Sequence, residues 1–432
     1  MSGSIGIGLL GYGTVGAAVA RALTSNATLI AAQAGAAVSL RRVLVRDASH
    51  PRALPPGAEL TDDPAALLDD PGIGVVVEAM GGERPAFDYI QRALHAGKHV
   101  VTANKEVMAK HGPEALAHAA EHGVSLRFEA SVGGGIPIIG PLLRDLAANE
   151  LTAVNAIING TTNYMLTRMA RDGLGYAEAL RRAQELGYAE PEPSSDVQGH
   201  DAAYKLAILA SLAFRTRVHA DDVYREGIER LDAADFRYAA ELGYVVKLLA
   251  AGRRVGGGVQ VRVHPAFLPA AHPLASVSGV LNAVELEGDL VGWAMFQGPG
   301  AGPGPTASAI VGDVIEVVRC AASGTAPPPP PSLDRGLRLE SIDDLETQYY
   351  LRLRAADRPG VMAAIAHVLG ARAVSLASVI QKEPARDDGT AEIVITTHTA
   401  REKAVRRAVE EMEALDAVLE VSNLVRVAGQ VV

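Results

Sequence analysis

The chain has 432 residues, 48% of them hydrophobic, and this length allows two or three domains with cores of their own. Its net charge of −10 argues against nucleic acid and an anionic membrane surface as partners, and no apolar run approaches the roughly 20 residues of a membrane helix. The single cysteine, Cys320, excludes an internal disulfide and a cysteine metal site, and the N-terminus lacks a secretion signal, so we expect a cytoplasmic protein.

The first predicted elements form a dinucleotide-binding turn. Residues 5–10 have the apolar pattern of a strand, and residues 15–23 have apolar side chains at helical spacing. Between them lies Gly-x-Gly-x-x-Gly, whose glycines permit a tight turn and let the backbone approach a pyrophosphate at the helix N-terminus. We expect the cofactor to contact Gly11, Gly13, Thr14, Val15 and Gly16.

The choice between the two nicotinamide cofactors depends on the end of the second strand. Residues 25–37 have no assigned structure, and the strand is predicted over residues 38–45, followed by Arg46 and Asp47. A carboxylate here binds a ribose diol and favours NAD, whereas an arginine pairs with a 2′-phosphate and favours NADP. The two adjacent residues therefore favour different cofactors. We favour NADP; otherwise Arg46 is a solvated surface charge.

Further strands are predicted over residues 73–78, 99–102 and 125–129. Strands that alternate with helical segments indicate an α/β fold with a Rossmann-type, doubly wound parallel sheet. We assign residues 1–135 to this dinucleotide-binding domain, together with a return helix over residues 305–322. Ligands of such sheets bind beyond the carboxyl ends of the strands, and Lys105 follows one of those ends.

Residues 136–304 are predicted to form an α+β substrate-binding and dimerisation domain. The expected helices include one with Leu142, Leu143 and Leu146 and others over residues 177–186, 201–214 and 239–251. Strands are expected near residues 153–159 and 259–263. A second glycine-rich turn, residues 298–306, precedes a helix from residue 307 to about residue 319, which we expect to pack on the nucleotide domain.

One helix of this region carries a candidate acid/base group. Asp201 and Lys205 are four residues apart and share a helix face. They could form a surface ion pair, but Leu206, Leu209 and Leu212 make the helix apolar enough to be buried, and a buried lysine needs a partner. Burial and nearby carboxylates tune a lysine for proton transfer.

A proline run at residues 327–331 indicates a stiff linker over residues 323–347. Beyond it, residues 348–428 have the β-α-β-β-α-β order of a ferredoxin-like unit. Strands are expected at residues 349–354, 374–380 and 391–396, and helices after residue 357 and over residues 401–415.

Three segments together resemble homoserine dehydrogenase. They are the N-terminal glycine turn, the run from Asn159-Gly160-Thr161-Thr162-Asn163-Tyr164 through Gly187-Tyr188-Ala189-Glu190-Pro191 to Lys205, and Gly300-Ala301-Gly302 with Pro305-Thr306. The resemblance covers about residues 1–320. It implies a reversible reduction of L-aspartate 4-semialdehyde to L-homoserine with NADPH or NADH, on the route to threonine, methionine and isoleucine.

The resemblance also implies roles for single residues. Lys205 is similar to the proton donor, and Lys105 to a second lysine that faces cofactor and substrate. Residues similar to substrate-binding ones are Glu190, Asp201, Gly160, Thr161 and Tyr188, although helix capping alone would explain Thr161. Gly187 and Gly302 match positions that line the cofactor. In the family a sodium ion is held through main-chain carbonyls, and the matching residues are Glu129, Val132, Gly134 and Ile136.

The C-terminal unit resembles an ACT domain, a ligand-sensing module, on Asp357-Arg358-Pro359-Gly360-Val361 and the strand from Val374. In this family such a tail implies feedback inhibition by L-threonine and a homodimer or homotetramer. Ala371-Arg372-Ala373 stands where the family often has a Gly- or Asn-containing turn near the effector, so a purely structural ACT unit is the alternative. The alternatives for the whole chain are a dehydrogenase for another small amino-acid aldehyde and a non-catalytic amino-acid sensor on a dinucleotide-binding scaffold.

Overall fold

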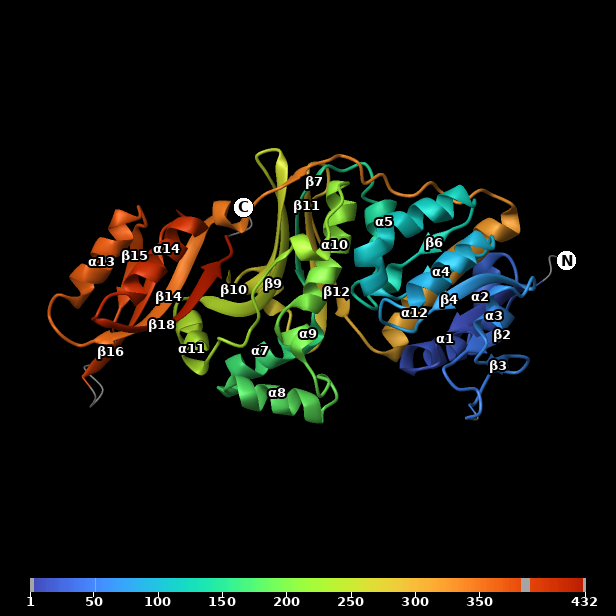
Figure 1. Cartoon of the computed structure of the whole chain (residues 1–432), viewed down its shortest axis with the longest axis horizontal. Coiled ribbons are helices and arrows are strands. Elements are labelled where there is room, and N and C mark those ends of the chain that lie inside the picture. The colour runs from blue at the N-terminus through green and yellow to red at the C-terminus, as the bar shows by residue number, and fades with distance from the viewer. Residues whose placement is uncertain (1–3, 51, 382–388, 430–432) are drawn as a thin grey trace. The chain divides into compact units, whose positions relative to one another are not determined.

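The computed structural model describes residues 4–50, 52–381 and 389–429. The chain divides into two compact units (Figure 1). The first unit comprises Met1–Val154, Tyr204–Asp221 and Asn282–Gly336, and the second comprises Asn155–Ala203, Asp222–Leu281 and Leu337–Val432. Each unit therefore gathers segments that are far apart in the sequence.

The first unit contains a six-stranded sheet in the order β3-β2-β1-β4-β5-β6, with every neighbouring pair parallel. Its elements are β1 (Ile5–Leu10), α1 (Thr14–Ser25), α2 (Ala27–Ala34), β2 (Val38–Leu44), β3 (Glu59–Thr61), α3 (Pro64–Leu68), β4 (Ile73–Glu78), α4 (Ala86–His95), β5 (His99–Thr102), α5 (Lys105–Glu121), β6 (Leu126–Arg127) and α12 (Pro303–Ser323). The strand order reverses at β1, so a ligand crevice is expected beyond the carboxyl ends of β1 and β4. The predicted doubly wound sheet is confirmed.

Helix α12 returns from late in the chain to this sheet, as predicted. It packs against α1, and Figure 1 shows the two helices side by side. Val314 and Val318 are buried in one apolar core with Val19 of α1 and Val75 of β4. Burial of such a continuous core is the main contribution that holds the late helix to the early sheet.

In the first unit, one stretch that was left unassigned is a helix, and one predicted strand needs correction. Residues 27–34, within the stretch that had no assigned structure, form α2, which ends at Gly35 with φ +75. The strand predicted over residues 125–129 is only Leu126–Arg127, and Glu129–Ser131 form a 3₁₀ turn. The chain turns there because the Glu129 N–H donates to the Asp313 carboxylate (2.8 Å) and its side chain accepts from Ile138 N (2.6 Å).

The second unit contains strands in the order β9-β10-β18-β14-β16-β15. Its elements are α7 (Gly160–Asp172), α8 (Tyr176–Glu185), α9 (Ser194–Val197), β8 (Tyr224–Arg225), α11 (Ala233–Glu241), β9 (Tyr244–Val255), β10 (Gly258–Pro269), β13 (Arg338–Leu339), β14 (Glu346–Ala356), α13 (Val361–Ala371), β15 (Leu376–Ile380), β16 (Thr390–Thr397), β17 (Ala400–Arg401), α14 (Glu402–Glu413) and β18 (Val418–Val427). The last strands and helices confirm the predicted β-α-β-β-α-β unit, whose core includes Leu351, Ile365 and Val405. The turn after α13 contains Ala373 with φ +56, a left-handed conformation that Gly or Asn adopts at lower cost.

The helix predicted over residues 239–251 is wrong for most of its length. Helix α11 ends at Glu241, Gly243 has φ +81, and residues 244–255 form β9. This strand pairs with all of β10 in an antiparallel hairpin closed by Gly256 and Gly257, which both have positive φ. Hydrogen bonding over the full hairpin outweighs the helical tendency of the Leu-Leu-Ala-Ala stretch.

Four further elements are α6 (Ile139–Leu143), β7 (Leu151–Ile157), β11 (Leu281–Gly288) and β12 (Gly292–Pro299), and helix α10 spans His200–Phe214. Leu146, which is predicted to lie within this helix, lies beyond the end of α6. Within the described part of the chain, no single helix is long and apolar enough to cross a membrane, although α1 and α2, bent by 80°, pass that test as a pair.

Candidate active site

The turn between β1 and α1 has the geometry of a phosphate cradle. Gly11 has φ +95, and a Cβ atom on it would lie 2.8 Å from the Ala79 carbonyl oxygen. A Cβ atom on Gly16 would lie 2.1 Å from the Gly11 oxygen, whereas one on Gly13 would meet nothing within 4 Å. The outer two glycines are therefore required by packing, and Gly13 faces open space at the N-cap of α1. No side chain caps this N-terminus, which leaves it suited to an anion.

A pocket of about 370 Å³ lies at the carboxyl ends of the strands of the first unit. It is lined by Val15 of α1, by the ends of β4 and β5, and by two glycine-rich turns. Lys105 and Lys205, which are 100 positions apart in the sequence, both line it. The structure thus brings together four of the predicted residues: Val15, Lys105, Gly134 and Lys205.

The glycine-rich turns at residues 133–135 and 298–306 meet at the wall of this pocket. Gly134 has φ +56, and a Cβ atom on it would lie 2.4 Å from the Gly300 oxygen. Gly135 N donates to the Pro299 oxygen (3.1 Å). Gly302 follows as the N-cap of α12, with φ +118. Only glycine fits at the crossing point, which explains the composition of both turns.

Lys105 is the first residue of α5, and its helix start is held from two sides. The Asn104 side chain caps α5 by accepting from Val107 N (3.1 Å) and donates to the Gly82 oxygen (2.7 Å). Lys205 is half-buried in α10, four residues after the buried Asp201. The prediction that this helix is buried is confirmed.

Glu78, at the end of β4, is a pocket-lining residue that the sequence interpretation did not single out. Its side chain is fully buried and accepts from Met80 N (2.8 Å), Gly81 N (3.4 Å) and the Thr102 hydroxyl (2.5 Å). Burial raises the pKa of the Glu78 carboxyl above its ordinary value, against the opposing effect of these hydrogen bonds. A signal was present: a carboxylate ends an otherwise apolar strand just before Met80-Gly81-Gly82.

Arg46 and Asp47 follow β2, and both are exposed. The Asp47 carboxylate accepts from Ser49 N (2.8 Å) and from the Ser49 hydroxyl (2.6 Å), and it lies 2.9 Å from His50 Nδ1. The Ser49 hydrogen bonds hold the pKa of the Asp47 carboxyl below its usual range. The acidic member of the pair is therefore engaged within its own loop.

A buried polar cluster in the second unit surrounds Asp201. Asn159 Nδ2 donates to both Asp196 (2.7 Å) and Asp201 (2.9 Å), and Asn159 Oδ1 caps α7 by accepting from Thr162 N (2.8 Å). Asp201 is only 2% exposed. Asn159 and Asp196 were not among the predicted site residues, because an amide that links two carboxylates leaves no local pattern.

The other predicted residues of the second unit lie near the ends of α7 and α8. Gly160 begins α7, and the Thr161 hydroxyl donates to the Tyr188 carbonyl (2.6 Å). Gly187 has φ +72 just after α8, and Gln184 donates to the Glu190 backbone oxygen (3.1 Å). The capping of α7 is done by Asn159, so capping does not account for Thr161. Glu190 is an exposed residue of this loop.

The predicted cation loop is compact. The Glu129 carboxylate accepts from the backbone N–H groups of Ile138, Ile139 and Gly140, and Ile136 N donates to the Gly133 oxygen (2.9 Å). Burial raises the pKa of Asp313, which accepts from Glu129 N, to about 8. Among the described residues no cluster of three His, Cys, Asp or Glu side chains suits a metal ion. A main-chain carbonyl site has no such cluster, so the cation stays a prediction.

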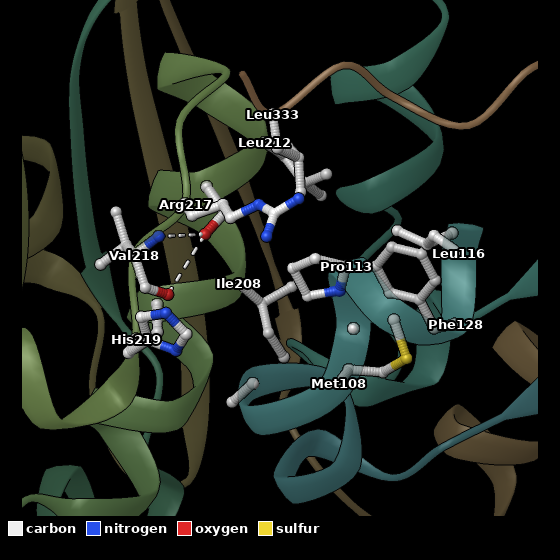
Figure 2. A pocket seen from close by; sticks show the side chains of 14 residues that line it. Met108, Pro113, Leu116, Phe128, Ile208, Leu212, Arg217, Val218, His219 and Leu333 are labelled. Atoms are coloured by element: carbon white, nitrogen blue, oxygen red, sulfur yellow. Dashed lines mark hydrogen bonds between the residues drawn. The ribbon is translucent and has the colours of Figure 1, made fainter. Parts of the chain in front are cut away.

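A second, apolar cavity lies between α5 and α10 in the first unit. Figure 2 shows Ile208 and Leu212 of α10 facing Pro113 and Leu116 of α5, with Leu333 of the linker above them. Its volume of about 30 Å³ has room for about one water molecule. Its lining packs together the two helices that carry Lys105 and Lys205, and it is not a substrate pocket.

Family models match most of the chain. The description "Homoserine dehydrogenase, NAD binding domain" matches residues 11–129, "Homoserine dehydrogenase" matches residues 137–315, and "ACT domain" matches residues 349–417. The three matched ranges coincide with the nucleotide sheet, the middle segments and the C-terminal unit.

Similar proteins cover the chain from end to end. A homoserine dehydrogenase of Synechocystis is 45% identical over 98% of this chain and 99% of its own length. The crystal structure of a homoserine dehydrogenase from Thiobacillus denitrificans has a TM-score of 0.93 at 42% identity, covering 98% of both chains. A hyperthermophilic archaeal homoserine dehydrogenase in complex with NADPH has a TM-score of 0.62 at 26% identity, covering 73% of this chain and 97% of that one.

Proposed function

This chain belongs to the homoserine dehydrogenase family, and from that premise we propose how its residues divide the work of the reaction. The enzyme is an NAD(P)-dependent oxidoreductase that interconverts L-homoserine and L-aspartate 4-semialdehyde. The sensor alternative is not favoured, because the matches are to dehydrogenases over nearly the full length. The observation that carries the division of roles is the single pocket lined by both Lys105 and Lys205.

The residues at the glycine turn fit a nicotinamide dinucleotide. Gly13 leaves open space in front of the uncapped N-terminus of α1, where a pyrophosphate gains from the helix dipole. Bound NADPH or NADH supplies the hydride that reduces C4 of the semialdehyde. Gly11, Thr14, Val15 and Gly16 complete the cradle, and Gly187 and Gly302 are assigned to further cofactor contacts by family resemblance.

Lys205 is the proposed proton donor to the aldehyde oxygen, and it takes the proton back in the reverse direction. An ammonium group in a pocket also stabilises the negative charge that develops on that oxygen. Lys105, the first residue of α5, adds a second positive charge in the same pocket. Two lysines in one pocket support this division of roles better than either one alone.

The second unit supplies the proposed amino-acid contacts. The Glu190 and Asp201 carboxylates are assigned to the α-ammonium group of the substrate, because opposite charges in a charge-assisted hydrogen bond discriminate strongly. The hydrogen bond from Thr161 to the Tyr188 carbonyl joins the start of α7, at Gly160, to the loop that carries Glu190. Gly160, Thr161 and Tyr188 are therefore proposed to shape the loop that surrounds the substrate.

NADP is the proposed preferred cofactor. The Asp47 carboxylate is engaged by Ser49 and His50 within its own loop, and Arg46 stands beside it as an exposed cation after β2. An arginine at this position pairs with a 2′-phosphate, and the archaeal relative is described in complex with NADPH. A sodium ion on the main-chain carbonyls of Glu129, Val132, Gly134 and Ile136 is the accompanying proposal.

The ACT domain is the proposed site of feedback inhibition by L-threonine, the amino acid made from homoserine. We also propose a homodimer or homotetramer and a cytoplasmic location. Support for assembly comes from β15 at the end of the strand order, where Val379 is 42% exposed. The oligomer size is tested by sedimentation of the full chain with and without L-threonine.

The test of the function is absorbance at 340 nm with purified protein, L-homoserine and either NADP⁺ or NAD⁺. We expect reduction, faster with NADP⁺, and suppression by millimolar L-threonine. Folded protein that reduces neither cofactor would overturn the assignment and restore the sensor hypothesis. Other amino alcohols serve as controls for the substrate.

A further inference from the structure

The proposed reaction gives no role to Glu78, the fully buried carboxylate of the pocket. Glu78 lines the same pocket as Lys105 and Lys205, and its side chain is fully buried. A buried carboxylate costs free energy unless it is well hydrogen-bonded. Its contacts therefore indicate what the fold gains from it.

On one side the carboxylate holds the turn that follows β4. It accepts from Met80 N (2.8 Å) and Gly81 N (3.4 Å), and Gly81 and Gly82 both have positive φ. This turn starts against the cofactor cradle, since a Cβ atom on Gly11 would lie 3.2 Å from the Met80 Cα atom. Glu78 thus fixes the wall that borders the dinucleotide turn.

On the other side the carboxylate holds the end of β5. The Thr102 hydroxyl donates to Glu78 (2.5 Å) and accepts from Asn104 N (3.0 Å), while Ala103 N donates to the Glu78 backbone oxygen (3.1 Å). Asn104 in turn donates to the Gly82 oxygen and caps the helix that Lys105 begins. Lys105 directly follows this anchored residue.

These contacts close a ring. It runs from Glu78 to the Met80–Gly81 amides, along the turn to Gly82, across to Asn104, and through Thr102 back to Glu78. The Met80 and Gly81 amides and the Thr102 hydroxyl all donate to the Glu78 side chain, so its two oxygens act as acceptors in the ring. A neutral glutamine would bring an N–H₂ group against one of the donors.

We propose that Glu78 is a positioning residue for the dehydrogenase reaction, which sets Lys105 and the Met80–Gly82 turn at a fixed spacing across the pocket. This inference rests on the proposed function for its effect on turnover. The ring itself exists without cofactor or substrate, so its integrity is measurable independently. Displacements of about 1 Å at such distances cost on the order of 100-fold in rate.

The test compares Thr102→Val, Thr102→Ser and Glu78→Gln with a matched control. Thr61 also ends a strand of this sheet, and its hydroxyl also accepts from a backbone N–H two residues on, that of Asp63 (3.0 Å), but it lies outside the pocket. We expect Thr102→Val and Glu78→Gln to lower kcat at least about 10-fold. Thr102→Ser should stay within about 3-fold of the wild type, since it keeps the hydroxyl, and so should Thr61→Val.

Two further measurements separate positioning from simple loss of folding. In cofactor-free protein, hydrogen exchange at the amides of Met80, Gly81 and Asn104 should become about 10-fold faster in Glu78→Gln and Thr102→Val, with exchange in the β1 and β2 core unchanged. In a Lys105→Ala background, Thr102→Val should have little further effect on kcat, because the two changes act through one group.

Unchanged exchange at these amides would overturn the ring, and full additivity with Lys105→Ala would overturn its action through Lys105. An equal loss of activity in Thr61→Val and Thr102→Val would also overturn it. If the wild type reduces neither cofactor, the proposed function fails, while the exchange measurement still tests the ring.

Discussion

Buried charges are stabilised in different ways in the two units. In the first unit, Glu78 accepts from amides and a hydroxyl, and the 6% exposed Lys98 donates to the Asp70 and Ile73 carbonyls (2.7 and 2.8 Å). In the second unit, the buried Arg426 and Arg352 instead bind carboxylates. Neutral dipoles hold a charge in place without cancelling it, whereas an ion pair cancels both members.

The ion pairs of the second unit centre on two arginines. Arg426, 1% exposed, donates to Glu226 (2.7 and 2.8 Å) and to the fully buried Glu402 (2.8 Å), which also accepts from the Tyr349 hydroxyl (2.9 Å). Burial acts to raise the pKa of Glu226, but Arg426 more than offsets this and lowers it to about 2.

The second arginine, Arg352, donates to the fully buried Asp235 (2.8 Å). Asp235 also accepts from Tyr350 (3.1 Å) and Asn423 (2.7 Å). Both clusters join residues 226–235 to strands of the ACT domain. Glu78 of the first unit therefore shapes a pocket wall, whereas Arg426 and Arg352 of the second unit fasten the ACT domain to residues 226–235.

The comparison first predicts that removing a pocket charge affects turnover and not stability. Lys205→Ala should lower kcat by about 1000-fold in both directions, because general acid catalysis is lost. The dissociation constant of NADPH, measured by fluorescence, should change less than about 3-fold. Lys110→Ala, an exposed lysine on α5, is the control, and near-normal turnover in Lys205→Ala would remove the residue from its role.

Removing a junction charge should do the opposite. Arg426→Met leaves Glu402 buried and without its closest cation, and we expect a loss of about 3–5 kcal/mol in the free energy of unfolding. Urea unfolding measures the loss, and Arg401→Met, at an exposed position, should cost less than about 1 kcal/mol. A loss below about 1 kcal/mol for Arg426→Met would mean that the junction does not depend on this pair.

A charge assigned to substrate should act on the Michaelis constant. Glu190→Gln should raise the KM for homoserine about 30-fold, since a charge-assisted hydrogen bond is replaced by a neutral one. Steady-state kinetics at saturating NADP⁺ measure it. The exposed neighbour Glu192 provides the matched control Glu192→Gln, and equal KM values in both variants would count against Glu190.

A charge assigned to the cofactor should act on cofactor choice. Arg46→Ser should raise the KM for NADP⁺ about 10-fold and leave that for NAD⁺ unchanged, because the 2′-phosphate loses its charged partner. Arg21→Ser, exposed on α1, should change neither. A parallel rise for both cofactors would show that Arg46 does not read the phosphate.

The smallest expected effect is a pH dependence of the junction. The pKa of Glu226 is about 2 in the folded chain, below its ordinary value of 4.5, so its stabilising contribution is full above about pH 4.5. That contribution is lost as the pH falls towards 2. Thermal unfolding between pH 2 and 6 should therefore depend less on pH in Glu226→Gln than in the wild type, and identical slopes would contradict the assignment.

Much of the fold follows from local patterns in the sequence. The strand–glycine–helix start depends on residues within a dozen positions of one another, and the structure has β1 and α1 where they were expected. Residues 244–251 fell within a helix predicted over residues 239–251, because their apolar pattern suits either structure. They form a strand because they pair with β10.

The family, the dinucleotide turn, the order of the C-terminal unit and the candidate lysines could be predicted from the sequence, because each is carried by motifs of fixed internal spacing. The packed fold was needed to show that Lys105 and Lys205 line one pocket, that Glu78 closes a ring with Thr102, and that Arg426 pairs with Glu226. Those partners are 24 to 200 positions apart in the chain. A hydrogen bond or ion pair depends on distance in space, and no local pattern records which distant groups the packed core brings within reach.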